Sequence, residues 1–444
     1  MGKDRHKKIQ DDDKLYSVLL HYVRWVVRLS YSSVLHVGEE NIPQRGAVIF
    51  APNHANTLMD AMVVLCYNHR PKVFVARADI FKHPTLAKIF TFLKIMPIMR
   101  QRDGYKAVKQ NQETIDKAVD VLRDNVPFCI FPEGTHQAKH SLLPISKGIF
   151  KIAFQAHEQM PETPLYIVPV GLTYGDFFRF RSSMRMEFGR PINVGTYISE
   201  HPALTPQEQQ SGLKELLAER LQASIFYIPN DDAYDATLEL CAASERLVAE
   251  EIRRKSHKRI HALELKQQAN NKTLRLLETL KNTAPEKAKE LLELGAEAAL
   301  LRKAGGIDIA SVSLKNPLLA RMPRVLLSLL VFPYLLAASL LAAPIVLISQ
   351  YFCTRIKDPA FANSIKFVVN LAVWPLFVLL YTIVAFLFLP WQWVLLASLL
   401  VMPAPYVADE LWKTARLLVS DIKLQRDKKL KKILSQICKR MAEE

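Results

Sequence analysis

Cysteine is scarce in this chain of 444 residues and suggests no structural framework. The five cysteines lie far apart, and they form neither a CxxC pair nor a mixed Cys/His spacing typical of a zinc site. The N-terminus lacks the apolar core of a secretory signal, and His6 stands where a myristoylation motif would need serine or threonine. These absences argue against a disulfide-stabilised secreted fold. We therefore expect the part of the chain outside any membrane to lie in the reducing cytoplasm.

Charged side chains are absent from two long apolar runs near the C-terminus, Val325 to Gln350 and Phe367 to Leu389. Each run is long enough to cross roughly 30 Å of hydrocarbon as a helix, so we predict two transmembrane helices. A third stretch, Trp391 to Val407, is shorter and contains two prolines. It predicts either a third span or an interfacial or re-entrant segment. The sequence thus indicates an integral membrane protein whose first partner is the lipid bilayer.

Acidic side chains are too few to balance the basic ones: 43 Asp and Glu stand against 59 Lys and Arg, which gives a formal net charge of +16. Such an excess points to an anionic partner. Net charge leaves three alternatives: a nucleic acid, an anionic membrane surface or a phosphorylated substrate. We identify no nucleic-acid recognition motif and no surface of interleaved basic and aromatic residues, and two bilayer spans argue against such a partner. We therefore expect no nucleic acid to bind.

The apolar pattern changes along the chain and divides it into five regions. Residues 1–31 predict an amphipathic membrane-anchor helix, and residues 32–202 alternate short β-rich runs with helical stretches, which is typical of an α/β domain. Residues 203–322 are charged, almost free of glycine and predict helical hairpins. The membrane segments occupy residues 323–408. Residues 409–444 predict a basic amphipathic helix, which suits an anionic cytoplasmic leaflet.

The predicted anchor helix has one narrow polar stripe, formed by Ser17, His21, Arg24 and Arg28. Such a helix either lies in the membrane interface or packs on the protein's own core, and both alternatives stay open. By the positive-inside rule, the α/β domain and the basic tail both prefer the cytoplasm, which requires an even number of spans. We therefore expect a two-span hairpin whose connection, near Cys353, lies on the opposite face of the membrane.

A histidine and an aspartate follow the first buried-looking run of the α/β region. The run AVIFAP leads into Asn53 and His54, and Asp60 follows six positions after His54. Transfer of an acyl group from a thioester to an alcohol needs a general base, and an imidazole held by a carboxylate is suited to neutral pH. The carboxylate fixes the tautomer and stabilises the imidazolium that forms. The alternative is a structural pair without a chemical role.

A second motif, Phe131 to Thr135, follows the run VPFCIF. Gly134 lets the backbone approach a ligand closely, and free N–H groups together with the Thr135 hydroxyl can hold an oxyanion or a phosphate. Glu133 would orient these donors, whereas in the alternative the motif is only a structural turn.

Two further blocks complete the set. Arg100 follows a short apolar run, and its planar guanidinium matches the oxygens of a phosphate, although a single surface arginine is usually just solvated. The block Val168 to Leu172 has no ionisable side chain and predicts a wall of the site.

These four blocks, in this order and at these separations, resemble the phospholipid/glycerol acyltransferase superfamily over roughly residues 32–195. The resemblance implies an α/β domain with a mixed sheet flanked by helices, followed here by a helical insertion and C-terminal transmembrane helices. It implies that His54 is the base and that Asp60 orients it. It further implies an acceptor-phosphate site formed by Arg100, Glu133, Gly134 and Thr135, and support of the acyl pocket by Asn53, Pro132, Val170 and Gly171.

The same resemblance implies the reaction. A fatty acyl group would pass from acyl-CoA or acyl-carrier protein to a hydroxyl of glycerol 3-phosphate or of 1-acyl-sn-glycerol 3-phosphate (lysophosphatidic acid), with no metal or other cofactor. The alternatives are an acyltransferase for another lysophospholipid and a non-catalytic membrane scaffold that keeps the fold.

The chain departs from the family pattern at two places. Five residues, Ala55 to Met59, separate His54 from Asp60, where most members have four. In this respect the chain is similar to the subgroup of fungal glycerol-3-phosphate and dihydroxyacetone-phosphate acyltransferases, which also carry C-terminal spans, and this favours glycerol 3-phosphate as acceptor. Lys94 stands where the arginine motif of the family usually begins with glycine.

Overall fold

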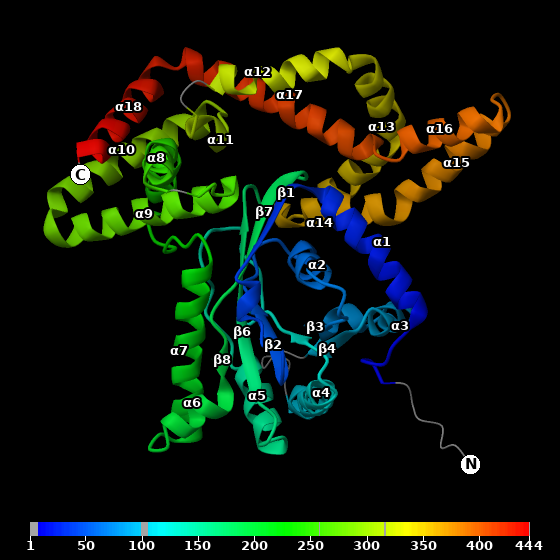
Figure 1. Ribbon diagram of the computed structural model, residues 1–444, viewed down its shortest axis with the longest axis vertical. Helices are drawn as coiled ribbons and strands as arrows, with labels where there is room; N and C mark the ends of the chain where they lie inside the picture. Colours follow the sequence, from blue (N-terminus) through cyan, green and yellow to red (C-terminus); the bar gives the residue numbers. More distant parts are fainter. Residues whose placement is uncertain (1–7, 99–104, 257, 315–316, 444) are drawn as a thin grey trace. The chain divides into compact units, whose positions relative to one another are not determined.

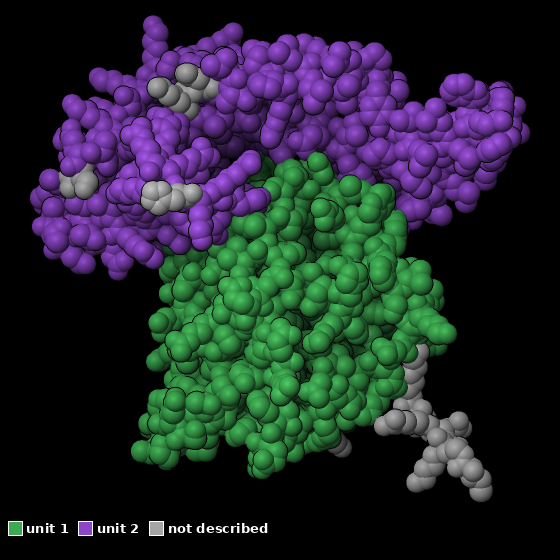
Figure 2. Space-filling model, viewed as in Figure 1, with its two compact units in different colours: residues 1–227, 358–364 green, residues 228–357, 365–444 purple. Residues whose placement is uncertain are grey.

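The computed structural model describes residues 8–98, 105–256, 258–314 and 317–443. The chain forms two compact units (Figure 2). Unit 1 contains Met1–Tyr227 together with Asp358–Ser364, and unit 2 contains Ile228–Lys357 and Ile365–Glu444. Unit 1 therefore includes a short segment from far along the chain, and we call residues 358–364 the connector.

Unit 1 is built on an eight-stranded sheet (Figure 1). Its strands are β1 (Tyr31–Val37), β2 (Ala47–Pro52), β3 (Val73–Arg77), β4 (Ile95–Ile98), β5 (Phe128–Cys129), β6 (Leu165–Tyr174), β7 (Ser182–Phe188) and β8 (Ile192–Asn193). Their order in the sheet is β1-β7-β6-β2-β5-β3-β4, and β8 pairs with β6. Strand β6 runs antiparallel to β7 and β8, whereas the other pairs are parallel. The predicted mixed sheet flanked by helices is confirmed.

Helices of unit 1 connect its parallel strands, because parallel neighbours need crossover connections, and further helices precede and follow the sheet. The helices of unit 1 are α1 (Lys14–Ser30), η1 (Glu39–Asn41), α2 (Leu58–Cys66), η2 (Ala78–Phe81), α3 (Pro84–Phe92), α4 (Tyr105–Arg123), α5 (Gly148–Gln159), α6 (Val194–Glu200), α7 (Pro206–Ser224) and, in the connector, η4 (Pro359–Phe361). Helix α7 begins with a capping box, in which Thr205 and Glu208 bond each other's backbone N–H groups, and has Pro206 in its first turn.

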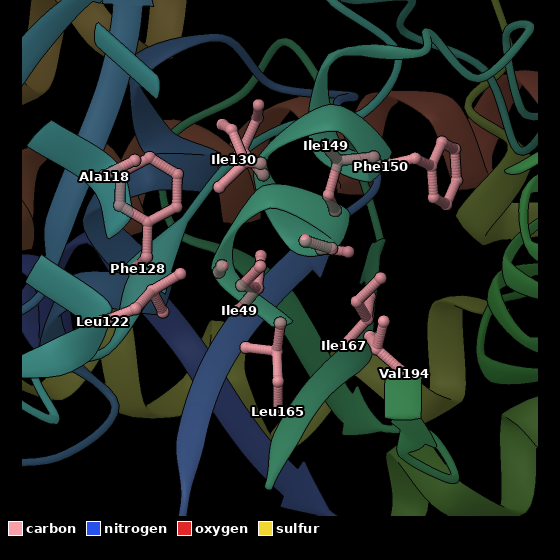
Figure 3. Packing of buried hydrophobic residues seen from close by; sticks show 14 of the residues in the cluster. Ile49, Ala118, Leu122, Phe128, Ile130, Ile149, Phe150, Leu165, Ile167 and Val194 are labelled. Carbon is pink, nitrogen blue, oxygen red and sulfur yellow. The ribbon is translucent and has the colours of Figure 1, made fainter. Parts of the chain in front are cut away.

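Strand β2 shows why the sheet is central: all six of its residues are buried. Its side chains alternate between the two faces of the sheet. Ala47, Ile49 and Ala51 belong to a core cluster with residues of α4, α5 and α7 (Figure 3). Phe50 points to the other face, where its ring lies 5.9 Å from that of Phe188. A strand buried on both faces needs an uninterrupted apolar run, which AVIFAP supplies.

Helix α1 combines the two alternatives that its sequence left open. Tyr16, Leu20, Val26 and Val27 are buried within unit 1, where the helix packs against α2 and β1. A second apolar set is exposed and consists of Leu15, Val18, Leu19 and Trp25. The spacing of this set puts it on one face of the helix, which fits an interfacial position in a membrane.

Unit 2 is helical. Its helices are α8 (Tyr234–Lys255), α9 (Ala262–Thr283), α10 (Pro285–Ala304), α11 (Ile309–Val312), α12 (Pro317–Leu330), α13 (Phe332–Arg355), the π-helix η5 (Val369–Val373), α15 (Trp374–Phe386), α16 (Trp391–Val401), α17 (Ala404–Arg426) and α18 (Lys428–Glu443). Helix α14 (Ala362–Val368) begins in the connector and continues into unit 2.

The basic tail differs from the single amphipathic helix that the sequence predicted. It forms α17 and α18, which are separated at Asp427. The apolar face of α18 is buried in a cluster with residues of α8, α9 and α10 and consists of Leu430, Ile433, Ile437 and Met441. This face stabilises the helical bundle and is not open to a leaflet.

Two helices in the described residues are long and apolar enough to cross a membrane. They are Phe332–Arg355 and the continuous stretch Pro359–Phe386, and a bent pair, Trp391–Val401 with Ala404–Arg426, could make a third span. Many of their large apolar side chains are exposed, and a bilayer would cover such a surface.

The connector between these two helices belongs to the sheet unit rather than to the helical unit. A hairpin of two complete spans puts its connection across roughly 30 Å of hydrocarbon from the domain that precedes it. Asp358–Ser364 instead belong to unit 1 and contact its sheet domain directly. The far-side position expected for the connection near Cys353 stays a prediction, because Cys353 belongs to unit 2.

Candidate active site

His54 and Asp60 meet at the junction of β2 and α2. Nδ1 of His54 lies 2.7 Å from Oδ2 of Asp60. The His54 side chain is 19% exposed, whereas that of Asp60 is 0% exposed. Since a carboxylate only accepts hydrogen bonds, this contact favours the tautomer with the proton on Nδ1 and leaves Nε2 of the neutral ring as a base.

Asp60 is buried, and four donors satisfy it. Oδ2 also accepts from the backbone N–H of Ala55 at 2.8 Å and of Asn56 at 2.6 Å. The hydroxyl of Tyr174, at the end of β6, donates to Oδ1 at 2.7 Å. Burial and the neighbouring Asp60 carboxylate raise the pKa of Tyr174 well above its usual value, so its hydroxyl stays protonated. Sequence reasoning missed Tyr174, because only the fold brings it to this carboxylate.

The turn from His54 to Asp60 accommodates its additional residue without losing the contact. Thr57 has φ 49° and ψ −123°, which is an outlier for a β-branched residue. The N–H of Met59 closes the turn by donating to the carbonyl of Asn56 at 3.0 Å. Backbone strain of this kind persists only where surrounding contacts hold it.

Glu133 ties the second motif to the first. Its Oε1 accepts from the backbone N–H of His54 at 2.7 Å, and its Oε2 accepts from that of Leu143 at 2.8 Å. Burial raises the pKa of Glu133 to about 7, although these two backbone donors act in the opposite direction. The carboxyl group therefore fixes the backbone at His54 and Leu143, and its role toward phosphate-binding donors stays a prediction.

The raised pKa of Glu133 predicts a pH-dependent stability. Between pH 4.5 and about 7 the folded chain holds a proton that the unfolded chain lacks, so this contribution is fully present below pH 4.5 and is lost as the pH rises through 7. The loss amounts to at most about 3 kcal/mol. We expect the unfolding midpoint of wild type to fall relative to that of Glu133→Gln as the pH rises from 5 to 7.5. A wild-type midpoint that stays constant or rises relative to the variant over this range contradicts the assignment.

Gly134 and Thr135 are exposed beside this carboxyl group. Gly134 has φ +66°, and a Cβ built there would meet no atom within 4 Å. The turn is thus open on its outer side, as a ligand-binding turn must be. Their contact with a phosphate stays a prediction.

Arg100 lies outside the described residues. Lys94, which precedes it, has φ +59°, the left-handed conformation for which glycine is best suited. The Lys94 ammonium donates to the carbonyls of Ile9 at 2.9 Å and Asp11 at 2.7 Å. The backbone here therefore keeps the conformation that a glycine would adopt, and the side chain gains partners in the N-terminal segment.

Three of the predicted support residues are fixed by hydrogen bonds or by burial near the site. Nδ2 of Asn53 donates to the carbonyl of Leu172 at 3.1 Å, and its Oδ1 accepts from the Leu172 N–H at 2.6 Å. The carbonyl of Pro132 accepts from the N–H of Ser146 at 2.7 Å. Val170 is fully buried in β6. Their relation to an acyl chain stays a prediction.

Gly171 has a packing role that can be tested. A Cβ at this position would lie 2.2 Å from the carbonyl oxygen of Ser224, at the end of α7, and that oxygen belongs to backbone. We expect Gly171→Ala to lower the free energy of unfolding by about 1–3 kcal/mol, as overpacking does. The matched control is Gly148→Ala, where a Cβ meets nothing within 4 Å. Equal unfolding midpoints for the two variants would contradict this role.

A second histidine stands beside His54 and was not singled out from the sequence. The ring of His136 lies 5.6 Å from that of His54 in an edge-to-face arrangement, and Phe131 stacks on His54 at 4.4 Å. His136 directly follows the second motif, so its position in the sequence was the available signal.

The described residues contain no group of three or more His, Cys, Asp and Glu side chains arranged to hold a metal ion.

Comparison with known proteins finds similarity to acyltransferases. Residues 33–173 match the protein-family model described as Acyltransferase. Over 157 residues the chain is 31% identical to glycerol-3-phosphate O-acyltransferase 2 of Saccharomyces cerevisiae. The matched segment covers 35% of this chain and 20% of the yeast protein. Over 160 residues it is 29% identical to the 1-acyl-sn-glycerol-3-phosphate acyltransferase of Limnanthes alba, which covers 35% of this chain and 53% of the plant protein.

Among solved structures, the chain is similar to the 1-acyl-sn-glycerophosphate acyltransferase PlsC of Thermotoga maritima, with a TM-score of 0.34 and 20% identity over 47% of this chain and 77% of that chain. The match spans about a fifth of the yeast relative and about half of the plant relative.

Proposed function

The chain carries a domain of the acyltransferase family over residues 33–173, and on that premise we propose that it transfers a fatty acyl group to a hydroxyl of glycerol 3-phosphate. The observation that carries the proposal is the His54–Asp60 contact of 2.7 Å beside an open Gly134–Thr135 turn. The name of the yeast relative and the five-residue spacing between His54 and Asp60 favour this acceptor. The names of other relatives keep 1-acyl-sn-glycerol 3-phosphate as the second candidate.

The chemistry follows from the tautomer that Asp60 favours. Nε2 of His54 takes the proton of the acceptor hydroxyl while the hydroxyl oxygen attacks the carbonyl carbon of the thioester. The carbon–sulfur bond then breaks, and the imidazolium returns the proton to the leaving thiolate, so an ester and a thiol result. Asp60 accepts the hydrogen bond from Nδ1 and stabilises the imidazolium. The donor is acyl-CoA or acyl-carrier protein, and no metal takes part.

The surroundings of the site suit lipid substrates. The apolar face of α1 and the two apolar helices could hold the protein in a bilayer, where long acyl chains are dissolved. We place the catalytic unit on the cytoplasmic face, where the basic surface of the chain meets anionic lipid.

The test is acyl transfer by the purified full chain in detergent or liposomes. Labelled acyl-CoA and acyl-carrier protein are offered separately, each with glycerol 3-phosphate or with 1-acylglycerol 3-phosphate. Product from glycerol 3-phosphate supports the proposal, and product from the monoacylated acceptor alone replaces it with the second candidate. Folded protein that acylates neither acceptor overturns both.

A further inference from the structure

The connector is built into the candidate active site. Oγ of Ser364 lies 2.6 Å from Oγ1 of Thr57, the strained residue between His54 and Asp60. Nδ2 of Asn363 donates to the carbonyl of Phe177 at 2.7 Å. Ser364 and Asn363 are both buried. The connector is therefore fixed against the catalytic turn, and Asp358 at its start has a defined position.

Asp358 forms a second histidine–carboxylate pair in this site. Its Oδ2 lies 2.7 Å from Nε2 of His136, and its Oδ1 accepts from the N–H of Ala360 at 2.9 Å. These hydrogen bonds lower the pKa of Asp358, so it is a carboxylate at neutral pH. The His136 ring lies edge-on between the rings of His54 and Phe361, at 5.6 and 5.4 Å.

This pair leaves the second ring nitrogen of His136 for a ligand. Because the Asp358 carboxylate only accepts, Nε2 of His136 donates to it. Nδ1 has no hydrogen-bond partner among the described residues, and the side chain is 20% exposed. A neutral ring offers Nδ1 as an acceptor for a hydroxyl, and a charged ring offers it as a donor to a phosphate oxygen.

We propose that His136, positioned by Asp358 of the connector, binds the polar end of the acyl acceptor beside His54. The proposal rests on the proposed function and names the residue that holds the acceptor. The reacting hydroxyl must come within about 2.6–3.2 Å of His54. The other polar groups of a glycerol phosphate then lie within one side-chain width of the His54 ring. The His136 ring and the open Gly134–Thr135 turn are found there.

The test compares His136→Ala and Asp358→Asn with wild type in steady-state kinetics. For His136→Ala we expect the KM of the acceptor to rise about 10- to 100-fold, as loss of one hydrogen bond to a charged group does. Both kcat and the donor KM should stay within about twofold. Asp358→Asn should shift the acceptor KM in the same direction but less. The control is Lys357→Ala, an exposed residue adjacent to the connector, which should change none of these constants.

Binding of the acceptor alone separates this proposal from the proposed function. Calorimetric titration with sn-glycerol 3-phosphate and with 1-acylglycerol 3-phosphate should show weaker binding by His136→Ala than by wild type. If His136→Ala binds the acceptor more weakly than wild type, but wild type transfers no acyl group, the binding role is supported and the proposed function is overturned. If wild type turns over normally and His136→Ala leaves the acceptor KM unchanged, the binding role alone is overturned. A fall in kcat of His136→Ala with a shifted pH profile also overturns it, because His136 would then act on His54. A wild type that neither binds nor acylates overturns both.

Discussion

His54→Ala should lose acyl transfer almost completely while the chain stays folded. We expect kcat/KM to fall by about 10²- to 10⁴-fold, which is the contribution of a positioned general base. The fall should be mainly in kcat, because the base acts in the transition state and contributes little to binding of the ground state. The His54 ring is part-exposed, and Asp60 keeps three other donors without it. The measurement is acyl transfer under saturating substrates together with the unfolding midpoint.

The matched control for this variant is His83→Ala. His83 is exposed at the start of α3, and its side chain makes no capping hydrogen bond there. The His83→Ala variant should retain wild-type rates. The comparison therefore distinguishes the loss of an exposed histidine from the loss of the base. If His54→Ala keeps more than a tenth of wild-type kcat with an unchanged fold, another group supplies the base and the assignment of His54 fails.

The contact between His54 and Asp60 could be predicted because both residues lie on one local turn. A strand end and a helix start six residues apart can place two side chains together by local geometry alone. Glu133 lies 79 positions from His54, and its motif directly follows the run that forms β5. A parallel sheet brings the carboxyl ends of neighbouring strands to one edge, so β2 and β5 carry their motifs to the same place.

The remaining parts of the site depend on contacts between distant segments. Tyr174 reaches Asp60 across 114 positions and Asp358 reaches His136 across 222, and apolar periodicity carries no information about either contact. The sequence of the basic C-terminal tail does not identify what its apolar face contacts, because that face fits a membrane surface and a helical bundle equally well. The structure buries that face in unit 2. The connector could not be placed either, since hydropathy predicts a span and leaves open what its ends contact.

Replacing Asp60 with asparagine should separate the charge of this residue from its geometry. An asparagine oxygen can take the place of Oδ2 and accept from His54, Ala55 and Asn56, while its NH₂ group faces a Tyr174 hydroxyl that is able to rotate and accept. The fold and the His54 tautomer are then kept, but the imidazolium loses its counter-charge. We expect kcat to fall by about 10²-fold or more with a modest loss of stability, measured by steady-state rates and by the unfolding midpoint.

Two companion variants decide which property of Asp60 matters. Asp60→Ala leaves several buried donors without an acceptor, each at about 1–3 kcal/mol, so this variant should be strongly destabilised as well as inactive. Tyr174→Phe removes one hydrogen bond to the carboxylate and keeps the charge, so its kcat should fall far less than that of Asp60→Asn. If Tyr174→Phe and Asp60→Asn lose activity equally, orientation of the carboxylate outweighs its charge. If Asp60→Asn is fully active, His54 does not depend on a charged partner and the proposed mechanism is wrong.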